Sequence, residues 1–332
     1  IVVPETIHTA FIKAADYFGL KVRRAKVDKN FRADVNHIKK LTNRNTALIA
    51  ASAPQYAHGV VDPITEIGIF AKKKKIPFHV DACFGGFILP WFEKLGETIP
   101  VWDFRVDGVT SISADIHKFG YAGKGASVLL YRDMSYLKHQ FFIDPDFPGG
   151  IYASPTILGT RPGGPIATAW AVLHKLGEEG YLELAERALE TRNNLRDGVA
   201  AINGLKILGS KHGPVVCYAS DDPSVDIYAV ADGLMSRGWS VDRPQNPASI
   251  HCTVNANNAK VLNEDLTDLA DAVADVRANP ALKREGEAAM YGMMARVPIR
   301  GAVKLGVRNV MEAMHAPEKF EGVESASDDD PM

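Results

Sequence analysis

The central segment of this chain is Ser113-Ala114-Asp115-Ile116-His117-Lys118-Phe119-Gly120-Tyr121-Ala122-Gly123-Lys124-Gly125. Apolar residues precede it at 108–112 and follow it at 126–131, which predicts two strands joined by a polar, glycine-rich turn. One interpretation is an ordinary solvated turn; the other concerns Lys118, which follows a histidine at the end of an apolar strand. Partial burial beside a second potential cation lowers the pKa of an amine, as an imine-forming lysine requires. The loop alone leaves both interpretations open.

A second segment, Ile76-Pro77-Phe78-His79-Val80-Asp81-Ala82-Cys83-Phe84-Gly85-Gly86-Phe87, predicts a buried strand that ends in a carboxylate. Open α/β sheets bind ligands at the carboxyl ends of their strands, and a buried aspartate needs a cation or a hydrogen-bond donor. A strand-end Asp81 upstream of a strand-end Lys118 is the pair that pyridoxal phosphate requires, the lysine for the imine and the carboxylate for the ring nitrogen. Gly85 and Gly86 would leave room for a flat ring. The alternatives are a structural aspartate that caps a helix and glycines that only mark a turn.

The two motifs, HVDAC-x-GG at 79–86 and S-x-x-x-HK at 113–118, resemble those of the fold-type I pyridoxal phosphate enzymes. Within these, they resemble the decarboxylase-like group that includes the glutamate and aromatic amino-acid decarboxylases. A further block at 147–164, FPGGIYASPTILGTRPGG, is similar to the corresponding run in the sphingosine-1-phosphate lyases. So are SAPQY at 52–56, GVVDPI at 59–64 and GEEGY at 177–181, and the resemblance covers nearly all of residues 1–255.

This resemblance implies an α/β fold with a mainly parallel sheet in a large domain and a smaller C-terminal α/β domain. Strands that alternate with helices favour the same fold class. The implied activity is that of a pyridoxal phosphate-dependent carbon–carbon lyase, which cleaves phosphorylated sphingoid bases to a long-chain aldehyde and phosphoethanolamine. One alternative is an amino-acid decarboxylase of the glutamate or aromatic type, against which the block at 147–164 and Lys124 argue. Another is a catalytically silent dimerising homologue, against which the intact Lys118, Asp81 and His8 argue.

The resemblance also implies roles for residues around the central segment. Lys118 would form the imine with the cofactor, and Lys124 matches a second family lysine that lines the active site, which we expect to bind the substrate phosphate. Asp81 would pair with the pyridinium nitrogen. His117 would reach the cofactor phosphate, with an ordinary hydrogen bond to the backbone as the alternative.

Further candidates lie outside the two motifs. His8, in the first turns of a predicted helix, matches the family histidine that stacks on the cofactor ring, although alone it would pass for a surface histidine. Tyr56 matches an active-site tyrosine, but the chain has His58 where the family usually shows a further aromatic residue. Thr160, next to Arg161, matches a residue, usually serine, that contacts the cofactor phosphate of the neighbouring subunit. We therefore expect a homodimer with shared active sites.

Composition excludes several other classes of protein. The net charge of the 332 residues is −2, so no overall field attracts nucleic acid or anionic membranes. Cys83, Cys217 and Cys252 are odd in number and far apart, which favours a reducing, cytoplasmic compartment over a zinc site or a disulfide framework. No apolar run approaches the roughly 20 residues that cross a bilayer, and no signal peptide is visible.

The first residue, Ile1, lies inside a predicted strand, so we expect a further N-terminal part before it. By resemblance, the main phosphate-binding loop of the family and the membrane anchor of its eukaryotic members would lie there. We therefore expect that this stretch alone does not enclose pyridoxal phosphate, and a membrane anchor upstream stays open.

Pattern and turn signals, together with the resemblance, predict four regions along the chain. Residues 1–165 form the C-terminal part of the cofactor-binding large domain, with Pro4 opening a helix that runs to residue 18 and a Gly/Pro-rich loop at 144–164. Residues 166–204 form connecting helices, at 166–176 and 181–202. Residues 205–317 form the small domain, with strands at 215–219 and 249–254 and helices at 224–237 and 264–278. The acidic tail at 318–332 is expected to be mobile.

Overall fold

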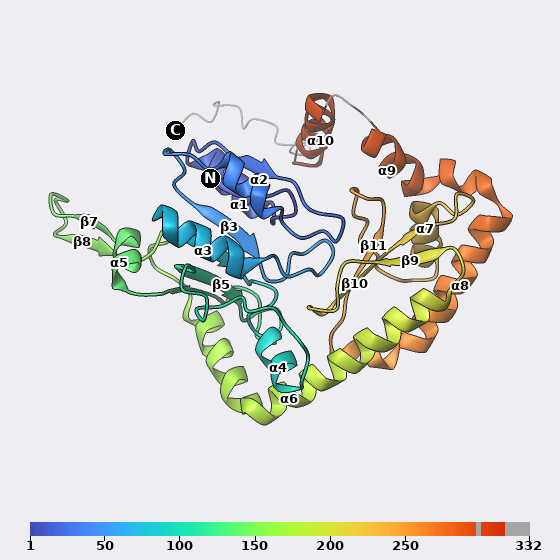
Figure 1. Ribbon diagram of the computed structural model, residues 1–332, viewed down its shortest axis with the longest axis horizontal. Coiled ribbons are helices and arrows are strands. Elements are labelled where there is room, and N and C mark those ends of the chain that lie inside the picture. The colour runs from blue at the N-terminus through green and yellow to red at the C-terminus, as the bar shows by residue number, and fades with distance from the viewer. Residues whose placement is uncertain (297–299, 316–332) are drawn as a thin grey trace, which may run out of the picture.

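The computed structural model describes residues 1–296 and 300–315, which form two α/β regions connected by a long helix (Figure 1). The predicted acidic tail at 318–332 lies outside the described residues. The first region contains a six-stranded sheet in the order β2-β1-β3-β4-β5-β6. Its strands are β1 (Val2–Pro4), β2 (Arg23–Ala25), β3 (Ile49–Ser52), β4 (Phe78–Asp81), β5 (Ser111–Asp115) and β6 (Ser127–Tyr131). All pair in parallel except β6, which runs antiparallel to β5, so the predicted mainly parallel α/β sheet is confirmed.

Helices cover both faces of this sheet, because apolar side chains alternate between two cores along the strands. In β3, Ile49 packs into the larger core while Ala50 packs into a smaller one on the opposite face. The larger core is completed by α2 (Val35–Leu41) and α3 (Ile64–Lys74), and the smaller core by α1 (Ala10–Tyr17). Every residue of β3 and β4 is buried. The central strands are therefore rigidly held up to the residues where they end.

The prediction that Pro4 opens a helix is wrong. Pro4 is the last residue of β1, and the chain turns before α1 begins at Ala10. His8 consequently lies outside the helix, and its Nδ1 accepts a hydrogen bond from the backbone N–H of Ala10 at 3.2 Å. The paired strand geometry of β1 with β2 extends through Pro4, which lacks a backbone N–H to contribute and still fits the strand end.

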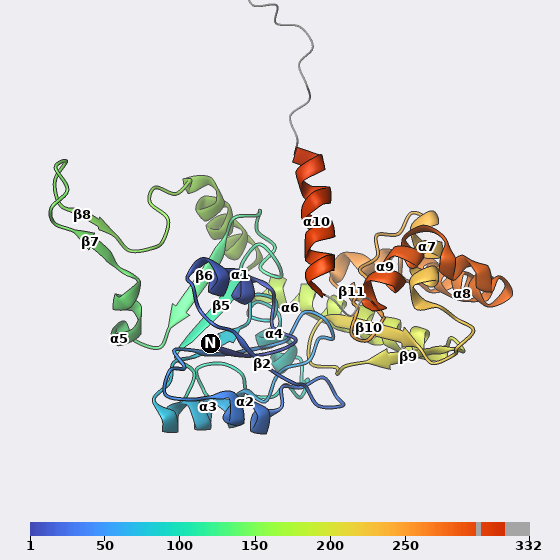
Figure 2. The same ribbon diagram turned by 90° about the horizontal axis from the view of Figure 1, so that it is seen from above.

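The segment predicted as a loop at 144–164 is partly a hairpin. Its strands β7 (Phe142–Asp144) and β8 (Tyr152–Ser154) pair antiparallel, after the short helices α5 (Met134–Leu137) and η1 (Lys138–Gln140). Figures 1 and 2 show this hairpin extending away from the rest of the chain. The two predicted connecting helices form one element, α6 (Gly163–Ala201), with a kink at Gly177, whose φ of 57° and ψ of −167° are not helical. Glycine reaches this conformation without a Cβ penalty, so the break falls between the two predicted helices.

The second region contains a three-stranded antiparallel sheet in the order β11-β10-β9, covered by two helices. The strands are β9 (Leu205–Leu208), β10 (Val215–Ser220) and β11 (Ile250–Thr253), and the helices are α7 (Ile227–Ser236) and α8 (Leu262–Ala278). The remaining elements are α4 (Leu89–Lys94), η2 (Ala256–Lys260), η3 (Pro280–Arg284), α9 (Gly286–Arg296) and α10 (Arg300–His315). Across the described ranges, no helix combines the length and the apolar character that crossing a membrane requires.

Candidate active site

The carboxyl ends of β3, β4 and β5 meet at one edge of the first sheet. The register pairs Ser52 with Asp81 and Asp81 with Ser113, so these residues lie side by side across three strands. Asp81 is the last residue of β4, and the turn that carries Lys118 begins directly after β5. The Tyr181 hydroxyl, on α6, donates a hydrogen bond of 2.7 Å to the Gly120 carbonyl at the far end of this turn. The turn is thus held between a strand and a buried tyrosine.

Lys118 contacts two side chains of this edge. Its Nζ lies 2.9 Å from Asp115 Oδ2 and donates to Cys83 Sγ at 3.1 Å, and it stands 5.8 Å from the centre of the Phe84 ring. Burial lowers the pKa of the amine, but the hydrogen bonds to Asp115 and Cys83 and their charges outweigh it, and the pKa lies above its ordinary value. The expectation of a lowered pKa is therefore wrong in this arrangement, because an aspartate faces the amine.

The Asp81 side chain is buried, and only one of its two carboxylate oxygens accepts hydrogen bonds from the protein. Its Oδ1 accepts hydrogen bonds from the Cys83 backbone N–H at 3.1 Å and from the Ser113 hydroxyl at 3.3 Å. Within the described ranges, no hydrogen bond uses Oδ2. Oδ2 is not among the fully buried atoms that lack a partner, so it is open to a ligand, and a protonated ring nitrogen is a donor that it could accept from. The residues present therefore fit a pyridoxal ring, with Cys83 connecting Asp81 to the amine of Lys118.

His79 supports Asp81 and was not among the residues that the sequence singled out. Its Nδ1 lies 2.9 Å from Ser111 Oγ and its Nε2 lies 3.1 Å from Ser113 Oγ, the hydroxyl that donates to Asp81. Burial lowers the pKa of His79 to about 4, so the ring is neutral at physiological pH. The signal that could have found it is the period of two in a strand, which puts residues 79 and 81 on one face of β4.

His117 lies beside this cluster and makes the backbone hydrogen bond that we considered as its alternative. Its Nδ1 lies 2.7 Å from the Ala126 carbonyl oxygen, and its Nε2 is 3.6 Å from Asp115 Oδ2. Nδ1 therefore carries a hydrogen, and Nε2 is the nitrogen left for other partners. Its contact with a cofactor phosphate stays a prediction.

Gly85 and Gly86 serve the packing of the protein itself. A Cβ at Gly85 would lie 2.0 Å from the Ala53 carbonyl oxygen, and one at Gly86 would lie 2.5 Å from Ala114 Cβ. Such distances leave no room for any side chain. We expected this pair to leave space for a flat ring. Instead, glycine is needed at both positions because three segments of the first region approach each other closely there.

His8 and Tyr56 line a second part of the site, a cleft of 750 Å³ between the two regions. The Tyr56 ring meets the Phe84 ring edge-on, with centroids 6.3 Å apart, and Phe84 in turn neighbours Lys118. The Tyr56 hydroxyl donates to Asp242 Oδ2 at 2.8 Å, and its ring stacks on His251 at 4.3 Å. Sequence reasoning missed Asp242 and His251, which come from the second region.

His58, the departure from the family pattern, is buried in the wall of the same cleft. Its ring stacks on Phe31 with centroids 4.0 Å apart, and its Nδ1 lies 3.1 Å from the Gln55 side-chain nitrogen. Burial, with the neighbouring His251 as a smaller cause, lowers the pKa of His58 to about 4. His58 is therefore a neutral stacked ring that takes the place of an aromatic residue.

Lys124, Thr160 and Arg161 form no hydrogen bond or ion pair with the described residues of this edge. All three are exposed, and no hydrogen bond or ion pair within 1–296 and 300–315 involves their side chains. Thr160 and Arg161 follow the hairpin β7–β8 and precede α6. Their predicted roles would require another subunit or a bound ligand.

The chain is similar to known proteins over most of its length. Residues 1–220 match the model of the pyridoxal-dependent decarboxylase conserved domain. The chain is 44% identical over 315 residues to the sphingosine-1-phosphate lyase of Arabidopsis thaliana, which covers 95% of this chain and 58% of that protein. It is 46% identical over 296 residues to sphingosine-1-phosphate lyase 1 of Rattus norvegicus, covering 88% of this chain and 52% of that protein. The chain thus spans a little over half the length of these relatives.

Solved structures agree with this similarity. The sphingosine-1-phosphate lyase of Burkholderia pseudomallei superimposes with a TM-score of 0.84 at 36% identity, covering 95% of this chain and 68% of that one. A glutamate decarboxylase of Lactobacillus brevis superimposes with a TM-score of 0.73 at 22% identity, covering 83% of this chain and 66% of that one, which shows a shared fold.

Proposed function

Because the chain belongs to the pyridoxal-dependent decarboxylase family and, within it, to the sphingosine-1-phosphate lyases, we propose that it acts as a carbon–carbon lyase on phosphorylated sphingoid bases. The products would be a long-chain aldehyde and phosphoethanolamine, with sphingosine-1-phosphate or sphinganine-1-phosphate as substrate. The observation that carries the proposal is the strand-end pair itself. Cys83 joins the two residues, because its thiol accepts from the Lys118 amine and its backbone N–H donates to Asp81 Oδ1. They lie at the sheet edge where such folds bind ligands, and Asp81 Oδ2 has no partner among the described residues.

Each residue of this edge has a definite task in the proposal. Pyridoxal phosphate, when bound, supplies an aldehyde that reacts with amines and a ring that withdraws electrons. Asp81 Oδ2 would accept the ring N–H and hold that proton in place. Lys118 is charged at rest, because Asp115 Oδ2, at 2.9 Å from Nζ, stabilises the ammonium, and the amine must release its proton to solvent before it reacts. His8 would lie against the ring, and Lys124 would bind the substrate phosphate.

A product assay tests the lyase against the decarboxylase. The full-length protein, loaded with pyridoxal phosphate, is given sphinganine-1-phosphate, and in parallel glutamate and an aromatic amino acid. We expect phosphoethanolamine and aldehyde in equal amounts from the first and no carbon dioxide from the others. Release of carbon dioxide would favour the decarboxylase. A protein without cofactor absorbance and without any product would favour the silent homologue.

We also propose that the protein is a homodimer with composite active sites. The hairpin β7–β8 and the segment after it expose large apolar side chains, among them Ile151 (79% exposed) and Ile157 (82% exposed). Exposed apolar side chains gathered on one projecting segment are typical of protein interfaces. A partner subunit that covers the hairpin would also bring a neighbouring site close to Thr160, which otherwise has no partner in its own described surroundings.

Thr160→Val should weaken cofactor retention, because it keeps the shape of the side chain and removes the hydroxyl donor. Mixed with Lys118→Ala protein, it should regain activity, since a mixed dimer carries one site with both native residues. The measurement is turnover after subunit exchange has been verified, with Thr168→Val, an exposed threonine of α6, as the matched control. Mixed samples that are no more active than either parent would show that Thr160 does not serve a neighbouring site.

We also propose that the protein works in the cytoplasm. All three cysteines are free thiols, and the Cys83 thiol accepts a hydrogen bond from the Lys118 amine. Unpaired thiols at a working site are typical of a reducing compartment.

A further inference from the structure

Tyr56 is held by the second region of the chain. Its hydroxyl donates to Asp242 Oδ2 at 2.8 Å, and its ring lies on His251 with an interplanar angle of 27°. The loop that carries it is packed against β10, since a Cβ at Gly59, where φ is +67°, would lie 2.6 Å from Val215 Cβ. These contacts join residues that are far apart in sequence at the side of the cleft nearest Phe84.

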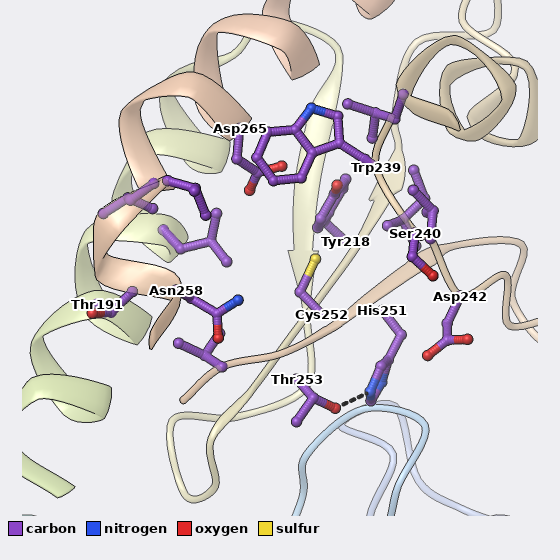
Figure 3. Close-up of a pocket in the computed structure, with 17 residues that line it drawn as sticks. Thr191, Tyr218, Trp239, Ser240, Asp242, His251, Cys252, Thr253, Asn258 and Asp265 are labelled. Carbon is purple, nitrogen blue, oxygen red and sulfur yellow. Dashed lines mark hydrogen bonds between the residues drawn. The ribbon is translucent and has the colours of Figure 1, made fainter. Parts of the chain in front are cut away.

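His251 is itself fixed in one tautomer. Its backbone N–H donates to the Asp242 carbonyl at 3.1 Å, and its Nδ1 lies 3.3 Å from the Ala57 carbonyl. Its Nε2 lies 2.9 Å from Thr253 Oγ1, as Figure 3 shows. Burial lowers the pKa of this ring, so it is neutral. A neutral ring with Nδ1–H turned to a carbonyl must accept at Nε2. His251 therefore supports the Tyr56 ring without competing for its proton.

The contact with Asp242 determines what Tyr56 can do. The Tyr56 hydroxyl has one hydrogen to donate, and it donates this hydrogen to Asp242, because a carboxylate can only accept. Burial, the hydrogen bond to Asp242 and its charge raise the pKa of Tyr56, so the proton stays on the phenol oxygen. The lone pairs that remain on this oxygen can accept a hydrogen bond, and no hydrogen bond within the described residues uses them. Tyr56 in this state suits a ligand that donates.

We propose that Asp242 is a positioning residue, which commits the Tyr56 proton and makes the phenol oxygen a hydrogen-bond acceptor for the substrate. The inference rests on the proposed function, because the matching donor is the hydroxyl on the carbon next to the amine-bearing carbon of a sphingoid base. A ligand that lacks this hydroxyl gains nothing from the arrangement. Other charged or titratable groups that line the cleft are Glu5, His8, Arg24, His58, Arg243 and Tyr291.

The kinetic test compares Tyr56→Phe, Asp242→Ala and the double variant in the full-length, cofactor-loaded protein. Loss of one hydrogen bond of this kind should lower kcat/KM for the hydroxylated substrate about tenfold. The double variant should be no worse than Tyr56→Phe alone, since Asp242 acts through Tyr56. The inhibition constant of the deoxy analogue should stay the same in all of them. Effects that multiply, or an analogue that binds more weakly in the variants, would show that Asp242 has only a structural role.

Asp222→Asn is the matched control, a carboxylate of the second region that pairs with Arg277 at 3.1 Å and does not line the cleft. It should leave kcat/KM for the substrate unchanged. A fall as large as that of Asp242→Ala would attribute the effect to any lost charge in this region and overturn the proposal.

A second measurement needs no turnover. In protein labelled with 3-fluorotyrosine, ring fluorine lowers the phenol pKa into an accessible range, and the ¹⁹F resonance of Tyr56 is the one that Tyr56→Phe removes. Asp242→Asn should make this resonance titrate at lower pH than in the parent, because a carboxylate no longer holds the proton. An unchanged titration would overturn the coupling. An inactive parent that still shows the shift would refute the proposed lyase function and leave the Asp242–Tyr56 coupling intact.

Discussion

Lys118→Ala should abolish turnover and remove the absorbance of bound cofactor. The amine that would react with the aldehyde of pyridoxal phosphate is lost, and among the described residues no other lysine pairs with Asp115 or Cys83. We expect the rate to fall by roughly 10³-fold or more, as for the loss of a nucleophile that works as part of a unit. The measurement is product formation together with the absorption spectrum, and Lys175→Ala, an exposed lysine of α6, is the control.

A second variant separates chemistry from stability. Lys118→Arg keeps a positive charge beside Asp115 and should melt close to the parent, but a guanidinium does not react with the aldehyde at neutral pH. It should be as inactive as Lys118→Ala. Substantial turnover in either variant would show that the lysine is structural and that the amine comes from elsewhere.

Asp81→Asn should keep the fold and lose most of the activity. The amide has the shape of the carboxylate and can retain the hydrogen bonds from the Cys83 N–H and the Ser113 hydroxyl, so the melting temperature should change little. It cannot hold a proton on the ring nitrogen, which weakens the electron withdrawal on which the reaction depends. We expect roughly a 10²-fold loss in kcat with cofactor still bound.

The control for this variant is Asp133→Asn, which changes a surface carboxylate at the N-terminus of α5. It should leave turnover as in the parent. A near-normal kcat for Asp81→Asn, with pyridoxal phosphate bound, would instead show that Asp81 is structural.

The sheet and the strand-end pair could be predicted because they depend on local sequence. Apolar runs that stop at Asp81 and before Lys118 mark strand ends, and parallel strands bring their carboxyl ends to one edge. The start of α1 could not be predicted in this way. Pro4 suits both the first turn of a helix and the end of a strand, and pairing with β2 decides for the strand.

Contacts between distant segments explain the other features that could not be predicted from the sequence. The pKa of Lys118 depends on Asp115, whose side chain faces the amine only once the turn has formed. Asp242 lies 186 residues from Tyr56 in the sequence, and no periodic pattern in either segment predicts their hydrogen bond. In the hairpin β7–β8, glycine and proline suggested a loop, but they lie mainly between and after two strands that pair.

Borohydride reduction shows directly whether this chain binds pyridoxal phosphate through Lys118. The full-length protein is loaded with the cofactor, reduced, digested and analysed by mass spectrometry. We expect a pyridoxyl group on the peptide that contains Lys118, with none after Lys118→Ala. A pyridoxyl group on Lys124 instead, or no labelled peptide from protein that retains its cofactor, would contradict this expectation.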